Sequence, residues 1–278
     1  MIDRQSAFPP DFLILGAQKC GTSSMASALR LHPDIYVPRS KEAHHFGFVD
    51  DDEVGGSHYQ SFFAEWAGQS VVGEATPRYL SRPRSAEQIC RYLPEVKAIV
   101  LLRNPIDRAY SAYWHGWRVG QLRGGFGEAV ESDLADGRPD PRAFEDIVRR
   151  GQYAEQLQRY IDLGFEEDRM LILRFDEILR DATGALLIVQ EFLGVDTVLT
   201  EFPHLNEARG TWLPRFMRKP LARRRRKQLG RRILRASRRP LTAPPMDSEV
   251  RALLVSHYRP WNDRLSVLLG RDFSDWDH

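Results

Sequence analysis

Cysteine is scarce in this chain, whose 278 residues include only Cys20 and Cys90. The two lie far apart, which excludes a disulfide framework and the clustered cysteines of a structural zinc site. The chain also lacks a basic segment followed by a long apolar one near its start. No run reaches the ~18 apolar residues that a membrane-spanning helix needs. These absences predict a soluble, cytoplasmic protein.

An excess of charge of one sign is also lacking, because 40 Lys and Arg offset 38 Asp and Glu to leave a net charge of +2. The one dense charge run is basic and covers residues 223–239. It suits contact with an acidic acceptor or with an anionic membrane, which would hold the protein peripherally, or it is a solvated helix face. Nucleic acid is not expected, because no aromatic side chains for base stacking accompany the run.

Internal repeats are absent, and apolar runs alternate instead with helical patterns. Strands are expected at residues 12–15, 70–73, 96–102 and 169–173, and helices at 21–31, 59–67, 86–92, 106–119, 153–162 and 182–193. This alternation predicts a three-layer α/β fold of the P-loop type, in which helices flank a central, mostly parallel sheet.

The chain is expected to form one domain, residues 1–278. Its α/β core would cover residues 12–195, and a helical, basic C-terminal extension would cover 196–278 and end in a helix at 247–269. Residues 121–141 are rich in Gly, Asp and Pro and are predicted to form a surface loop.

The first predicted strand runs into a glycine-rich stretch, Gly16-Ala-Gln-Lys-Cys-Gly-Thr-Ser-Ser24. Its glycines have the spacing of a nucleotide-binding loop, G-x-x-x-x-G-K-[ST], but Lys19 precedes the second glycine and Thr22 occupies the usual lysine position. Backbone N–H groups at the start of the following helix favour an anion, and three successive hydroxyls add donors. We therefore predict a phosphate-binding loop in preference to an ordinary strand–helix turn.

A nucleoside triphosphatase would have a second strand that ends in an aspartate and helps to hold Mg²⁺. The strand expected at 96–102 is followed instead by Arg103-Asn-Pro, so we expect protein cations, and no metal, to neutralise the bound anion. Pro105 suits the first turn of a helix, and Ser111 lies two turns along it. Arg103 and Ser111 either hold a second phosphate or belong to an ordinary surface helix.

Together the two motifs resemble the sulfotransferases that use PAPS (3′-phosphoadenosine 5′-phosphosulfate), in the branch of the heparan sulfate sulfotransferases and their bacterial relatives. The loop matches G-x-x-K-x-G-T-[ST]-[ST], and residues 103–113 match R-[ND]-P-x-x-R-x-x-S-x-Y. The resemblance covers about residues 12–195. It implies that Arg103 and Ser111 hold the 3′-phosphate. The residues that it implies for the 5′-phosphosulfate are Lys19, Cys20, Gly21, Thr22, Ser23 and Ser24.

Two further segments match the family and concern the chemistry. Residues 74–79 match E-[KA]-[ST]-P-x-Y, which implies that Glu74 is the general base rather than a solvated acid. Residues 41–46 match K-E-x-H-[FY]-F, except that His45 replaces the aromatic residue. The match implies that Lys41, with His44, contacts the transferred sulfuryl group; the alternative is an ordinary surface turn. Because no further ligand accompanies the two histidines, no metal site is expected.

Two more residues are candidates for the nucleotide site. Residues 151–157 match G-x-Y-x-x-x-L, which implies that Tyr153 lies near the nucleotide, although a core tyrosine also fits the pattern. The basic K-G-R string that closes over the nucleotide in the family is lacking here. Arg209 is the nearest candidate to replace it.

The sequence thus predicts transfer of a sulfuryl group from PAPS to an acceptor hydroxyl, or to an amine, with release of PAP (adenosine 3′,5′-bisphosphate). The acceptor is expected to be a carbohydrate, a glycolipid or a small metabolite that contacts residues 47–58 and 121–141. Two alternatives stay open: an atypical P-loop kinase, which would need Mg²⁺, and a non-catalytic module that binds anions.

If the basic run recruits an anionic acceptor or membrane, neutralising four arginines in 223–239 should raise the KM for the acceptor and flatten its salt dependence, because salt screens exposed charges. Nucleotide affinity should not change. Kinetics at low and high salt measure this effect, and unchanged values would indicate a solvated helix face.

Overall fold

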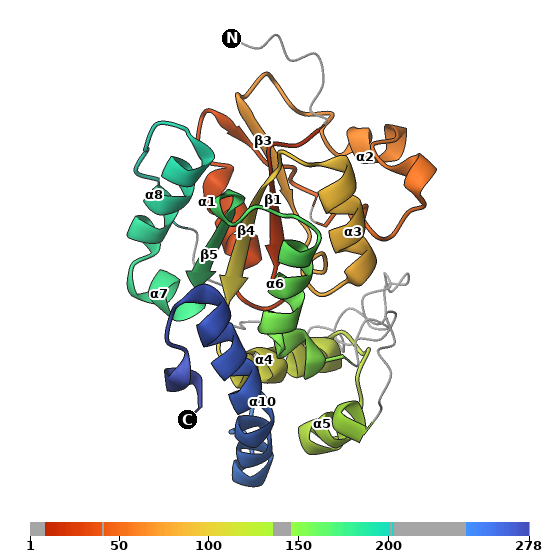
Figure 1. Ribbon diagram of the computed structural model, residues 1–278, viewed down its shortest axis with the longest axis vertical. Coiled ribbons are helices and arrows are strands. Elements are labelled where there is room, and N and C mark those ends of the chain that lie inside the picture. The colour runs from red at the N-terminus through yellow and green to blue at the C-terminus, as the bar shows by residue number, and fades with distance from the viewer. Residues whose placement is uncertain (1–8, 41, 136–145, 201, 203–242, 278) are drawn as a thin grey trace, which may run out of the picture.

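The computed structural model of the chain describes residues 9–40, 42–135, 146–200, 202 and 243–277. Its five strands form one sheet in the order β2-β3-β1-β4-β5, with every pairing parallel (Figure 1). The strands are β1 (Phe12–Gly16), β2 (Ile35–Tyr36), β3 (Val71–Ala75), β4 (Lys97–Leu102) and β5 (Met170–Arg174). The α/β fold and the four predicted strands are confirmed.

Helices cover both faces of this sheet. Helices α3 and α6 contact each other on one face, and α1 and α8 contact each other on the other (Figure 1). The helices are α1 (Thr22–Leu29), α2 (Ser57–Ser61), α3 (Pro83–Tyr92), α4 (Pro105–Arg118), α5 (Phe126–Ala135), α6 (Tyr153–Asp162), α7 (Phe175–Arg180), α8 (Ala182–Leu193) and α10 (Ser248–Leu269). Short 3₁₀ turns occur at η1 (Asp51–Glu53), η2 (Arg149–Gly151), η3 (Glu167–Arg169) and η6 (Ser274–Trp276).

The central strands are buried, as expected for a parallel sheet covered on both faces. Every residue of β1 is buried, as is every residue of β4 except Lys97. Strands β1 and β3 also approach closely at Gly73, where a Cβ atom would lie 2.4 Å from the ring of Phe12. Glycine at this position therefore lets β3 lie tightly against β1 beside the site.

A second apolar cluster lies beyond the carboxyl ends of the strands, where α4, α5 and the first half of α10 pack together. The surface loop predicted at 121–141 is wrong over 126–135, because these residues form α5. Phe126, Val130 and Leu134 recur at helical spacing and face the aromatic side chains of α4; the ring centroid of Phe126 lies 5.3 Å from that of Tyr113.

Three elements besides α5 were not predicted from the sequence in their observed form. Strand β2 has only two residues and α7 only six, so neither offers a full hydrophobic period. Helix α2 is shorter than the predicted 59–67. The helix predicted at 247–269 is α10, whose first turn is capped by the carboxylate of Asp247, which accepts a 2.8 Å hydrogen bond from Glu249 N. None of the described helices has the length and the apolar character needed to cross a bilayer.

Candidate active site

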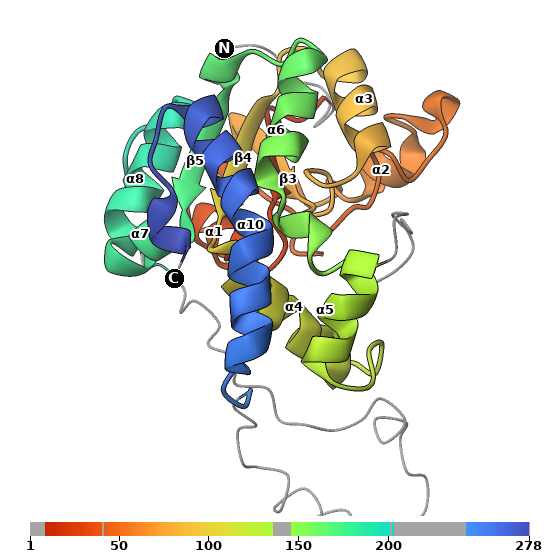
Figure 2. The same cartoon turned by 60° about the horizontal axis from the view of Figure 1, so that its bottom comes forward.

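The carboxyl ends of three adjacent strands carry the candidate residues. Strand β1 leads into the glycine-rich loop, β3 carries Glu74, and β4 is followed by Arg103. From β1 the chain builds β3 on one side and β4 on the other, so the order of the strands reverses at β1. Open α/β sheets bind ligands in the crevice at such a reversal. The strand ends face α4 and the first half of α10 (Figure 2).

The loop after β1 turns sharply into the N-terminus of α1. Lys19 and Gly21 have left-handed backbones, with φ of 73° and 88°, and Gly21 caps α1. The first-turn N–H groups of a helix have no acceptor within it, so they point out of its end. The side chains of Lys19 and Ser23 are half-buried, while those of Thr22 and Ser24 are buried. The outward N–H groups, together with the lysine and the hydroxyls beside them, are the donors that an anion-binding loop needs.

Cys20 faces the interior instead of the crevice. Its side chain is fully buried, and its Sγ lies 3.9 Å from the hydroxyl of Tyr153. Its backbone N–H donates to Ala17 O at 3.2 Å. Burial raises the pKa of the thiol, although the charges of Arg108 and Arg103 oppose this. Cys20 therefore supports the loop from beneath.

The second predicted phosphate site lies at the start of α4. Asn104 caps this helix through its Oδ1, which accepts from Ile106 N at 2.9 Å. The half-buried Arg103 lies just before the cap, and its guanidinium lies 5.1 Å from the centre of the Phe175 ring. Ser111 is half-buried on the same helix. One strand–helix unit therefore carries both expected ligands of the 3′-phosphate.

Tyr153 is brought to this unit by α6. Its side chain is buried, and its hydroxyl donates to the backbone carbonyl of Arg103 at 2.9 Å. The structure thus joins Tyr153 to the backbone of Arg103, which sequence spacing alone could not indicate.

Glu74 is the most perturbed carboxyl group of the site. It is only 3% exposed, and Thr76 Oγ1 donates to its Oε2 at 2.8 Å. Its Oε1 is buried and has no hydrogen-bond partner among the described residues. Burial raises the pKa of Glu74 to about 7, although the hydrogen bond from Thr76 opposes the shift. A carboxyl group with such a pKa can gain or lose a proton near neutral pH.

Sequence reasoning missed a second carboxylate, Glu42. Its Oε2 lies 3.1 Å from Nε2 of His44, and the two side chains are 36% and 40% exposed. Both residues have left-handed backbones, with φ of 59° and 46°. Their charges act on Glu74 in opposite directions, His44 lowering and Glu42 raising its pKa. The sequence itself pointed to Glu42, because this residue is the glutamate of the K-E-x-H segment that also contains Lys41 and His44.

His45 fills the position of the family's aromatic residue and packs as one. Its ring stacks on Tyr59 with 4.3 Å between centroids, and its Nε2 accepts from Gly55 N at 2.9 Å. Burial, and then the charge of His58, lower the pKa of His45 to about 4. The imidazole is therefore neutral and structural.

The segment after His45 is held firmly on α3. Gly47 N donates to Gln88 Oε1 at 2.6 Å, and Ser85 Oγ donates to Phe46 O at 2.7 Å. Gly47 has φ of 77°, and a Cβ there would lie 2.5 Å from Ser85 Oγ. The start of the expected acceptor segment, residues 47–58, is thus fixed on α3 three residues after His44.

A buried cation beside the loop was also missed. Arg150 is 8% exposed, and its Nη1 donates to Gln18 Oε1 at 2.9 Å, next to Lys19. Burial, and then the charge of Arg78, lower the pKa of Arg150 to about 10. Only the tertiary fold could reveal the contact, because 132 residues separate Gln18 and Arg150.

Several predicted residues cannot be placed. Lys41, Arg209 and the basic run 223–239 lie outside the described residues. Within the described ranges, no group of three or more His, Cys, Asp or Glu side chains could hold a metal ion.

Comparison with known proteins agrees with this geometry. A family model described as "Sulfotransferase domain" matches residues 9–207. Heparan sulfate glucosamine 3-O-sulfotransferase 6 of Mus musculus is 28% identical, over 96% of this chain and 74% of the relative. Heparan sulfate glucosamine 3-O-sulfotransferase 3A1 of Homo sapiens is 25% identical, over 100% of this chain and 64% of the relative. A crystal structure of a sulfotransferase from Alicyclobacillus acidocaldarius is 28% identical, with a TM-score of 0.73 over 97% of this chain and 99% of that one.

The raised pKa of Glu74 has a consequence for stability. Between its ordinary pKa of 4.5 and its folded pKa of about 7, the folded protein keeps a proton that the unfolded chain releases. The free energy of unfolding should therefore fall as the pH rises through this window. Because Glu74→Gln cannot ionise, it should lose this pH dependence and exceed the wild type at pH 8 by up to about 3 kcal/mol.

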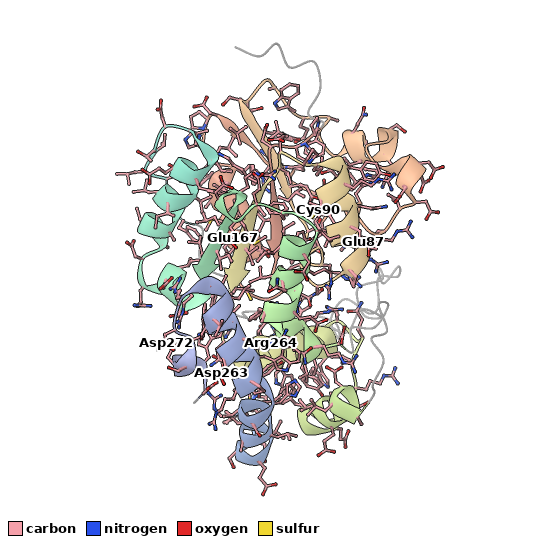
Figure 3. The ribbon with its side chains drawn as sticks, viewed as in Figure 1. Glu87, Cys90, Glu167, Asp263, Arg264 and Asp272 are labelled. Atoms are coloured by element: carbon pink, nitrogen blue, oxygen red, sulfur yellow. The ribbon has the colours of Figure 1, made fainter. Side chains whose placement is uncertain are left out.

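Urea titrations at pH 5 and pH 8 measure this difference. Glu87→Gln is the matched control, because Glu87 is an exposed glutamate on α3 (Figure 3). Parallel pH profiles for Glu74→Gln and the wild type would show that Glu74 does not hold its proton in the folded state.

Proposed function

Because this chain belongs to the sulfotransferase domain family, we propose that it moves the sulfuryl group of PAPS to an acceptor hydroxyl by in-line displacement. One observation carries the proposal: the loop after β1, Arg103 and the Glu42–His44–Glu74 cluster all lie at the carboxyl ends of the sheet's strands. The acceptor oxygen attacks sulfur while the bond from sulfur to the bridging phosphate oxygen breaks. PAP leaves with that electron pair, and the hydroxyl proton passes to a carboxylate.

The donor would be held by cations and backbone N–H groups. Lys19, with the N–H groups at the start of α1 and the hydroxyls of Thr22 and Ser23, would stabilise charge on the leaving phosphate. Arg103 and Ser111 would hold the 3′-phosphate and so select PAPS over nucleotides that lack it. Tyr153, and Arg209 and Ser24 as expected from the family, would complete the nucleotide site.

Two carboxylates can receive the acceptor proton. Glu74, the base expected from the sequence, has a pKa of about 7 but is only 3% exposed. The side chain of Glu42 is 36% exposed and is oriented by His44. A base must come within hydrogen-bond reach of the proton that it removes. Its greater exposure therefore favours Glu42 as the group that contacts the acceptor hydroxyl. Glu74 would then act on Glu42 through its charge from the interior, or it would take the proton itself.

A carbohydrate is the acceptor that we favour. The relatives are named as sulfotransferases of heparan sulfate glucosamine, and the expected acceptor segment, residues 47–58, follows His44 closely in the chain. A glycolipid or a small metabolite is compatible with the same chemistry. Lys41 would contact the sulfuryl oxygens, and the basic run 223–239 would attract an anionic acceptor or membrane.

The kinase and the non-catalytic module fit less well. Both are disfavoured because the chain belongs to the sulfotransferase domain family. The strand end that would hold Mg²⁺ in a kinase is followed by the cationic Arg103.

The 3′-phosphate can be tested by binding alone. PAP should bind more tightly than AMP by about 10- to 150-fold, because charge-assisted hydrogen bonds contribute roughly 1.5–3 kcal/mol. Arg103→Ala should remove most of this preference, and Ser111→Ala part of it. Calorimetry with both nucleotides provides the measurement. Equal affinity of the wild type for PAP and AMP would contradict the assignment of the second phosphate.

The chemistry can be tested by comparing three variants. Loss of a general base costs about 10²–10⁴ in rate, so Glu42→Gln should lower kcat by that factor with PAP affinity nearly unchanged. A comparable loss in Glu74→Gln alone would assign the base to Glu74. Lys19→Ala should lower both turnover and PAP affinity, because Lys19 would contact the donor itself.

The acceptor is first identified by incubating the protein and labelled PAPS with cell-extract fractions and measuring transfer of the label. The rates of the variants are then measured with the purified acceptor. Near-normal rates for Glu42→Gln and Glu74→Gln together would show that the base lies elsewhere.

A further inference from the structure

Residues 272–277 follow α10 and lie beside α7, close to the ends of β4 and β5 (Figures 1 and 2). Figure 3 labels Asp272, the first of them. They fall outside residues 9–207, which match the family model. Within them, Phe273 and Trp276 are buried, at 0% and 3% exposed, while Asp272, Ser274 and Asp275 are exposed, so the two aromatic side chains anchor the segment on the protein.

The segment contacts two residues next to Arg103, namely the side chain of Asn104 and the ring of Tyr153. Asn104, which caps α4, donates from its Nδ2 to Trp276 O at 3.1 Å. The indole of Trp276 packs edge-on against Tyr153, with 6.2 Å between ring centroids and 70° between planes. Tyr153 in turn donates to the carbonyl of Arg103 at 2.9 Å. Trp276 therefore steadies both Asn104 and the tyrosine that holds Arg103.

A second set of contacts leads from the segment to the guanidinium of Arg103. Arg174, at the end of β5, donates from Nη1 to Asp275 Oδ1 at 3.0 Å and from Nε to Asp176 Oδ1 at 3.1 Å. Its guanidinium also lies 5.1 Å from the centre of the Trp276 ring. Phe175 lies between Arg174 and Asp176 in the sequence, and its ring is the one against which the guanidinium of Arg103 lies.

We infer that Asp275 and Trp276 are positioning residues that hold Arg103 ready for the 3′-phosphate. Neither would touch the ligand. An arginine loses much rotamer freedom when it is immobilised, so holding it in advance lowers the cost of binding. This inference rests on the proposed function of Arg103 and extends it to a segment that the family match does not include.

The test compares PAP with AMP, because only PAP carries the phosphate that Arg103 would bind. Trp276→Ala should weaken PAP binding about 5- to 20-fold, which lies within the range found for contacting residues, and leave AMP affinity within about 2-fold. Trp276→Phe keeps an aromatic edge on Tyr153 and should stay near wild type. Asp275→Asn keeps the shape, removes the charge that clamps Arg174, and should shift the same ratio in the same direction.

A double-mutant cycle separates positioning from a general loss of structure. In an Arg103→Ala background, Trp276→Ala should cause no further loss of PAP affinity, because the residue that it positions is gone. Equal weakening of PAP and AMP, or an unchanged PAP affinity in the folded Trp276→Ala and Asp275→Asn variants, would overturn the inference while leaving the proposed function standing. A wild type without preference for PAP would remove the 3′-phosphate assignment itself, and this inference with it.

Discussion

Strand β1 pairs with β3 on one side and with β4 on the other, and these two pairings bring the glycine-rich loop, Glu74 and Arg103 to the same end of the sheet. The register sets Leu13 opposite Glu74 and Ile14 opposite Ile99. Successive side chains of a strand point to opposite faces, so a slip of one residue would turn Glu74 to the other face of the sheet. Burial of the apolar side chains of β1 and β4 prevents such a slip, and Gly73 permits the close approach of β3.

This arrangement also separates charges of opposite sign. The carboxylates lie on the β3 side of the loop, with Glu74 in that strand and Glu42 near it, while Arg103 follows β4 on the other side. A donor bound with its 3′-phosphate toward Arg103 would present its sulfuryl end toward the carboxylates. Burial keeps the pKa of Glu74 near 7, so the anionic donor meets less opposing charge than two ionised carboxylates would exert.

Much of the site could be read from local pattern, and the remainder shares one feature. The loop with its displaced lysine, the strand before Arg103 and Glu74 in its strand were all recognisable, because each lies within a short run with its own periodicity. Sequence reasoning missed the contact of Arg150 with Gln18, that of Arg174 with Asp275 and that of Asn104 with Trp276. Each joins residues about 100 or more positions apart, and no local pattern encodes such pairs.

By itself, the sequence determined the α/β class and four of the five strands, because hydrophobic period is a local property, and its glycine spacing predicted an anion-binding loop. It did not determine which carboxylate is exposed, since Glu42 and Glu74 differ only in what surrounds them. Burial of Glu74, packing of His45 as an aromatic ring, and folding of residues 126–135 as α5 against α4 were decided by the tertiary structure. The physical reason is that desolvation and packing depend on neighbours that only the folded chain assembles.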